Sequence, residues 1–81
     1  MSVVTLYGKP GCHLCDDARR EIAQVRAEVP FALEEVDVSL DPVLHARYGE
    51  RIPVVEVDGE ELFEYFVDPV VLRKRVDTVG R

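Results

Sequence analysis

The sequence predicts one α/β domain over residues 1–81, with its elements in the order β-α-β-α-β-β-α. Three observations support this prediction. Short β-prone runs alternate with helical segments, one helical segment carries an apolar stripe, and a two-residue turn joins the last two strands. Hydrophobic residues make up 47% of the chain, which is typical of a folded protein with a core. A chain of 81 residues has room for one domain.

The first half of the chain is predicted to be a βαβ unit. Val3–Tyr7 is short, apolar and β-prone, and glycine and proline residues follow it directly. A helix is expected from about Cys12 until Pro30 stops it, and Phe31–Val38 is expected to be the second strand. The apolar stripe of the helix recurs at steps of three and four, at Cys15, Ala18, Ile22, Val25 and Val29. Two strands joined in this way should be parallel, with a right-handed crossover.

A short second helix is predicted between Asp41-Pro42 and Gly49. Aspartate suits the N-cap, proline suits the first helical position, and glycine suits the C-cap. Asp68-Pro69 repeats the N-cap signal, so a third helix should begin there. We expect that helix to finish on Arg73–Arg75, because cations are favourable at the carbonyl end of the helix dipole.

A β-hairpin is predicted between the second and third helices. Asp58-Gly59 forms a typical two-residue turn, and it separates the β-prone run Val54–Val57 from Glu61–Tyr65. These two strands should therefore pair in the antiparallel direction.

Charge and hydropathy narrow the classes of partner. The chain has 10 Lys and Arg against 16 Asp and Glu, a net charge of −6, which argues against a nucleic-acid binder. No apolar run approaches the roughly 18 residues of a membrane helix. Residues 1–7 show neither the basic leader nor the cleavage site of an export signal. We therefore expect a cytoplasmic protein with no nucleic-acid or membrane partner.

The two cysteines, Cys12 and Cys15, are the best candidates for chemistry. A bridge between them closes a very small loop, so it would stabilise the fold little. At a spacing of three on a helix, the two side chains share a face and their sulfur atoms can bond. Cys12 lies at the amino end, where unpaired N–H groups favour a thiolate, whereas Cys15 lies on the buried stripe. The pattern predicts an exposed attacking thiol at Cys12 and a shielded resolving thiol at Cys15.

Metal binding and inert packing are the alternatives for the cysteine pair. Structural zinc takes four ligands, and the chain adds only His13 and His45 to the cysteines. Because His13 lies between Cys12 and Cys15, it is badly placed to complete the same tetrahedron, and we predict no metal site within one chain. An iron–sulfur cluster shared by two chains, with small thiols completing the coordination, remains an alternative, as do two inert buried cysteines.

Three segments together resemble the glutaredoxins, and above all the short bacterial glutaredoxin-like proteins. They are residues 9–15 (Lys-Pro-Gly-Cys-His-Leu-Cys), 51–55 (Arg-Ile-Pro-Val-Val) and 57–59 (Val-Asp-Gly). The similarity covers nearly the whole chain. It implies a thioredoxin fold, in which a four-stranded mixed sheet has helices on both faces, with Cys12 as nucleophile and Cys15 as resolving thiol.

The resemblance also implies roles for residues around the cysteines. Pro53 matches a cis-proline that faces the active site, and the backbone of Ile52 would pair with an extended thiol substrate. Lys9 matches a basic residue placed near a carboxylate of glutathione, although a solvated loop lysine is an equal alternative. His13, when protonated, would favour the Cys12 thiolate, or it is an exposed spectator at the helix start.

We therefore expect a monomeric dithiol oxidoreductase, with no bound cofactor, that reduces protein or small-molecule disulfides. Its reductant would be glutathione, as a co-substrate, or a thioredoxin-type reductase. Glutaredoxins usually carry Gly-Gly and an acidic residue after the last strand, where this chain has Glu-Tyr-Phe-Val-Asp at 64–68. That departure leaves a different class open: a non-catalytic thioredoxin-fold binding module, or a dimeric iron–sulfur cluster carrier.

Overall fold

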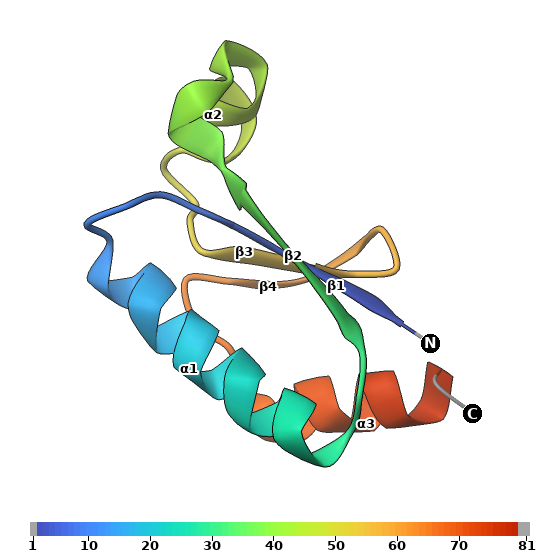
Figure 1. Ribbon diagram of the computed structural model, residues 1–81. Coiled ribbons are helices and arrows are strands. Elements are labelled where there is room, and N and C mark those ends of the chain that lie inside the picture. The colour runs from blue at the N-terminus through green and yellow to red at the C-terminus, as the bar shows by residue number, and fades with distance from the viewer. Residues whose placement is uncertain (1, 80–81) are drawn as a thin grey trace.

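The computed structural model describes residues 2–79 and shows a four-stranded mixed sheet with three α-helices (Figure 1). The strands are β1 (Val3–Gly8), β2 (Ala32–Asp37), β3 (Val54–Val57) and β4 (Glu60–Glu64). The helices are α1 (His13–Glu28), α2 (Pro42–Tyr48) and α3 (Pro69–Val79), with a short 3-10 helix, η1 (Val38–Leu40), before α2. The predicted class and order of elements are confirmed, and η1 is an addition. No helix within residues 2–79 has the length and apolar character needed to cross a bilayer.

The sheet has the strand order β2-β1-β3-β4. β1 and β2 are parallel, and β3 is antiparallel to both β1 and β4, so the predicted βαβ unit and hairpin are confirmed. Asp58 and Gly59 have φ values of 51° and 84°, as a tight hairpin turn requires. β4 begins and ends one residue earlier than predicted. It ends before Tyr65 because Tyr65 has a φ of 67°, which no strand residue adopts.

The main core lies between the sheet and the layer formed by α1 and α3, which lie together on one side in Figure 1. The contributing residues include Val4 and Leu6 of β1, Val55 and Val57 of β3, Ala18, Ile22 and Val25 of α1, and Leu72 and Val76 of α3. The predicted stripe of α1 is therefore buried, except that Val29 is half-buried as the helix C-cap.

α2 covers the opposite face of the sheet at one end. Leu6 belongs to the main core, so Tyr7, the next residue of the strand, points the other way. There the ring of Tyr48 from α2 stacks on Tyr7, with 4.5 Å between ring centroids. Both hydroxyls donate to the Glu56 carboxylate, at 3.1 Å from Tyr7 and 3.2 Å from Tyr48. Burial, with the bond to Glu56, raises the pKa of Tyr7 to about 12. Helices thus lie on both faces, as the resemblance implied.

The predicted N-caps are confirmed. Asp41 Oδ1 accepts from the amides of the second and third helical residues of α2, at 2.9 and 3.4 Å. Asp68 Oδ1 does the same for α3, at 3.0 and 3.3 Å. Gly49 is the C-cap of α2, but its φ of −54° is right-handed. Glycine is needed there for space, because a Cβ would lie 2.5 Å from the carbonyl oxygen of His45.

Two further elements have bounds that differ from the predicted ones. The third helix does not finish on Arg73–Arg75 but continues to Val79, because Val76 is buried one turn after Leu72 and must stay helical to reach the core. The second strand, predicted as Phe31–Val38, is Ala32–Asp37. The Asp37 carboxylate accepts from the amide of Ser39 and caps η1, so the chain turns out of the sheet at Val38.

Candidate dithiol site

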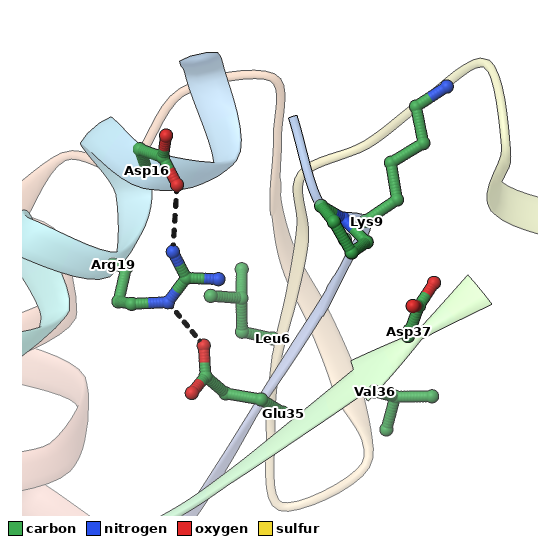
Figure 2. A pocket seen from close by; sticks show the side chains of 9 residues that line it. Leu6, Lys9, Asp16, Arg19, Glu35, Val36 and Asp37 are labelled. Atoms are coloured by element: carbon green, nitrogen blue, oxygen red, sulfur yellow. Dashed lines mark hydrogen bonds and ion pairs between the residues drawn. The ribbon is translucent and has the colours of Figure 1, made fainter. Parts of the chain in front are cut away.

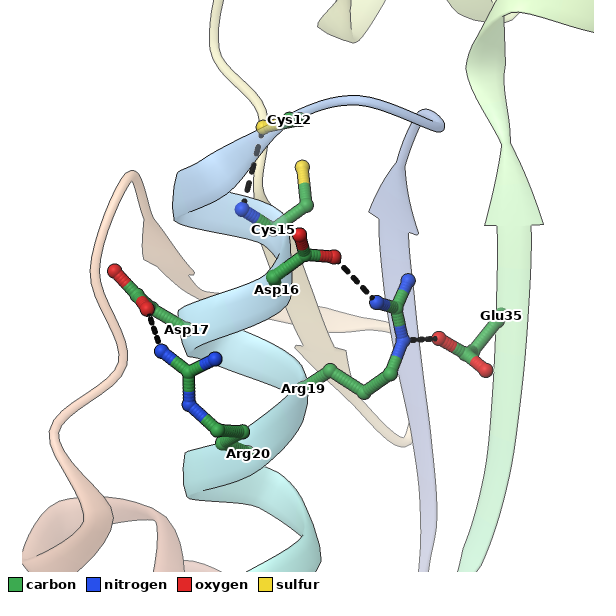
Figure 3. Close-up of polar contacts among 7 residues, drawn as sticks. All are labelled: Cys12, Cys15, Asp16, Asp17, Arg19, Arg20 and Glu35. Carbon is green, nitrogen blue, oxygen red and sulfur yellow. Dashed lines mark hydrogen bonds and ion pairs between the residues drawn. The ribbon is translucent and has the colours of Figure 1, made fainter.

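Cys12 is the N-cap of α1, at the point where the chain turns out of β1. Its Sγ accepts a hydrogen bond of 3.2 Å from the backbone N–H of Cys15, drawn in Figure 3. Its carbonyl accepts the first helical bond, 3.1 Å from the amide of Asp16. Gly11, with a φ of 80°, makes the turn that precedes it. Cys12 is half-buried, and its sulfur lies at the positive end of the helix with an amide hydrogen directed at it.

Cys15 lies one turn further along α1 and is fully buried. Its sulfur lies against Gly8 of β1, where an added Cβ would be 3.0 Å from Sγ. Burial raises the pKa of the Cys15 thiol to about 11, and contact with Cys12 acts in the same direction. The backbone N–H of Lys9 and the charge of Arg19 partly oppose this shift. Both cysteines are free thiols, and Cys15 is a shielded thiol that stays protonated at neutral pH.

Two ion pairs lie within the first turns of α1, and a third joins this part of the helix to the sheet. Arg19 donates to Asp16 at 2.9 Å and to Glu35 of β2 at 2.5 Å, and Arg20 pairs with Asp17 (Figure 3). These carboxylates raise the pKa of Arg19 further above its usual range. Each pair is exposed, so each contributes roughly 0–1 kcal/mol to stability. Of the three, only the Arg19–Glu35 pair joins the cysteine-bearing helix to β2.

Lys9 lies in the loop between β1 and α1, beside a pocket of about 340 Å³ formed by β1, β2 and α1. In Figure 2 its side chain extends away from the Asp16–Arg19 pair. Among residues 2–79 its ammonium group makes no ion pair, and the side chain is exposed. The structure therefore brings the backbone of Lys9, and not its charge, to the buried sulfur.

Ile52 lies in the same buried cluster as Cys15, directly before Pro53. The Ile52–Pro53 peptide bond is cis, which confirms the expectation from the resemblance. Cys12 packs against the same cluster. Neither the N–H nor the carbonyl of Ile52 makes a hydrogen bond to any residue within 2–79. A backbone edge that can pair with an extended peptide thus lies beside the two thiols.

His13 and His45 do not extend the site into a metal centre. His13 is the first residue of α1 and His45 lies on α2, and both are exposed. Within residues 2–79, no group of three or more histidine, cysteine or acidic side chains is arranged to hold a metal ion.

The sequence patterns did not predict the turn after β4. Tyr65 has a φ of 67°, and the amide of Phe66 donates to the carbonyl of Glu64 at 2.8 Å, which together define a γ-turn. A tyrosine carries no signal for this conformation, which costs of order 1–3 kcal/mol in a non-glycine residue. The turn leaves Phe66 exposed beside the start of α1.

Comparisons with known proteins agree with this geometry. The model of the glutaredoxin-like domain family (DUF836) matches residues 3–77. The uncharacterised protein Rv0508 of Mycobacterium tuberculosis is 33% identical over 75 residues, which cover 86% of this chain and 77% of that protein. The structural genomics target XcR50 from X. campestris is 37% identical, with a TM-score of 0.76 over 93% of this chain and 96% of that one.

Two further solved structures share the architecture. Protein Ne2328 from Nitrosomonas europaea has a TM-score of 0.80 at 27% identity, over 93% of this chain and 91% of that one. A thioredoxin from Halobacterium salinarum has a TM-score of 0.72 at 20% identity, over 99% of this chain and 75% of that one, and therefore shows the fold alone. The predicted thioredoxin fold is confirmed, and a C-x-x-C pair at the start of its first helix points to redox chemistry.

Proposed function

The chain belongs to the glutaredoxin-like domain family, and on this premise we propose that it is a dithiol thiol–disulfide oxidoreductase. The observation that carries the proposal is the amide of Cys15 bonded to Cys12 Sγ at the start of α1. This hydrogen bond activates the sulfur of the half-buried Cys12. The buried Cys15 thiol lies one helical turn away. Cys12 is the nucleophile and Cys15 the resolving thiol.

The proposed reaction has two exchange steps. The Cys12 thiolate attacks one sulfur of a substrate R–S–S–R′, so that a Cys12–S–R bond forms, the substrate bond breaks, and R′S⁻ leaves and takes a proton from water. Cys15 then loses its proton and attacks Cys12 Sγ, which forms the Cys12–Cys15 bridge and releases RS⁻. Two electrons pass from the protein to the substrate. A dithiol reductase, or two molecules of glutathione, must return them.

The surroundings of the two sulfurs suit this order of events. The raised pKa of Cys15 keeps the resolving thiol protonated until a mixed disulfide forms next to it. The Lys9 amide and the Arg19 charge then favour the Cys15 thiolate during the second step. The unpaired backbone of Ile52 would hold an extended substrate by main-chain hydrogen bonds.

Two serine variants test the proposal, with a small aromatic disulfide as substrate and mass spectrometry of the protein after acid quenching. We expect Cys12→Ser to lose at least about a hundredfold of the reduction rate, because it lacks the nucleophile. Cys15→Ser should accumulate the mixed disulfide on Cys12, because nothing displaces it. If Cys12→Ser reduced the substrate at the wild-type rate, the proposal would be wrong.

A further inference from the structure

A second pocket, of about 430 Å³, lies between the first turns of α1 and the loop after β4. Much of its wall is apolar and comes from Leu14, Ala18, Phe66, Val67 and Pro69. Phe66 is 70% exposed, so its ring is accessible to a molecule that enters the pocket.

Two features place this pocket next to the dithiol site. Leu14 lies between Cys12 and Cys15 in the sequence and contributes one wall of the pocket from the first turn of α1. On the other side, the amide of Tyr65 donates to the carbonyl of Pro53 at 2.8 Å, which fastens the Phe66 loop to the cis-proline. A chain joined to Cys12 and paired with Ile52 therefore has this pocket beside it.

The charged groups of the pocket favour a neutral or cationic occupant over an anionic one. Asp17, Arg20 and Glu21 line it, which gives a net charge of −1, and Arg20 is already paired with Asp17. Glu21 has no ion-pair partner among residues 2–79, and the whole chain carries −6. Glutathione brings two carboxylates and one ammonium group, a net charge of −1, to such a site, whereas a neutral or basic polypeptide brings no net negative charge.

We propose that the substrate is an extended polypeptide disulfide with a large apolar side chain next to its reactive cysteine, held in the pocket of Leu14 and Phe66. This proposal rests on the dithiol activity proposed above and names its substrate class. The electrons and bonds move as in the two exchange steps already given, with the polypeptide thiol as the group released.

The test compares kcat/KM for three substrates at equal ionic strength. Two are synthetic cysteine peptides joined to the same aromatic thiol and identical except for leucine or glutamate beside the cysteine, and the third is glutathione disulfide. We expect the leucine peptide to react about tenfold faster than the glutamate peptide and glutathione disulfide. Phe66→Ser should lower kcat/KM for the leucine peptide about fivefold, because it removes roughly half of the apolar surface that the side chain would cover.

Two variants serve as controls. Phe66→Leu should keep most of the preference, because it keeps an apolar wall. Leu40→Ser removes an apolar side chain that is 81% exposed but lies outside this pocket, and it should leave all three rates unchanged.

The outcomes separate this inference from the proposed function. If the wild-type protein reduces both peptides and glutathione disulfide equally well, or if Phe66→Ser slows all three equally, the pocket does not select the substrate and this inference is wrong. If no substrate is reduced in a Cys12-dependent way, the proposed function itself fails.

Discussion

Gly8 offers a sharp test of how closely the buried thiol is packed. An alanine Cβ at this position would lie 3.0 Å from Cys15 Sγ and 3.3 Å from Cys15 Cβ, whereas ordinary contacts begin at 3.4 Å. The sulfur would have to retreat by about 0.4 Å in a core packed at crystal-like density. Overpacking of this kind costs about 1–3 kcal/mol, which lowers the folding equilibrium constant about 5- to 150-fold. The expected decrease in the free energy of unfolding is therefore large enough to measure.

A double-mutant cycle assigns that loss to the sulfur. Urea unfolding under reducing conditions gives the stability of the wild type, Gly8→Ala, Cys15→Ala and the double variant. In the Cys15→Ala background the sulfur is gone, so adding the Gly8 methyl should cost only a few tenths of a kcal/mol. Gly59→Ala is the matched control, since Gly59 has a φ of 84° and open space around its Cβ position. It should cost about 1–2 kcal/mol in both backgrounds.

The reasoning is refuted if Gly8→Ala destabilises the protein equally with and without the Cys15 sulfur. That result would mean that the methyl group meets something other than the resolving thiol. A fully tolerated Gly8→Ala, with no loss of stability in either background, would also contradict the packing described here.

Three further predictions follow from the pKa shifts and the helix caps. In Cys12→Ser, iodoacetamide should label Cys15 slowly at pH 8 and faster toward pH 11, because burial raises its pKa to about 11; labelling at the rate of a free thiol at pH 8 would contradict this. The folded-state pKa of Tyr7 is raised to about 12 from 10, so its contribution to stability is complete below pH 10 and is lost as pH rises to 12. In urea titrations, Tyr7→Phe should therefore lose less stability than the wild type between pH 10 and pH 12. If the two proteins lose the same amount, the raised pKa does not belong to Tyr7. Asp68→Ala should lower stability by about 1 kcal/mol and Asp68→Ser should restore most of it, whereas equal losses in the two variants would argue against capping.

Local sequence patterns predicted most of the fold. The stripe of α1, the two aspartate caps and the Asp58-Gly59 turn each depend on a few neighbouring residues, so sequence spacing was sufficient to place them. The end of α3 was missed because the burial of Val76 outweighs the preference of arginine for a last turn. That burial is a property of the assembled core, which the cation signal alone does not reveal.

For the site, as for the fold, the features that depend on neighbouring residues were predictable and those that join distant segments were not. The spacing of Cys12 and Cys15 at a helix start predicted one thiol at the amino end of the helix and one on its buried stripe, and both positions are confirmed. That the Cys12 sulfur accepts the amide of Cys15 was not predicted. The contact of Gly8 with Cys15 and the bond of Tyr7 to Glu56 join segments far apart in the chain, so no local pattern shows them. The cis peptide before Pro53 came from the resemblance, because composition does not distinguish a cis from a trans proline.

Equilibration of the reduced protein in glutathione redox buffers, followed by acid quenching and mass spectrometry, tests the central claim most directly. The account predicts that the wild type converts to a species lighter by two hydrogens, with the bridge mapped to Cys12 and Cys15, and that Cys15→Ser instead carries one glutathione on Cys12. A wild type that accumulates stable glutathione adducts without an internal bridge, or whose two thiols stay reduced in the most oxidising buffer, would contradict it.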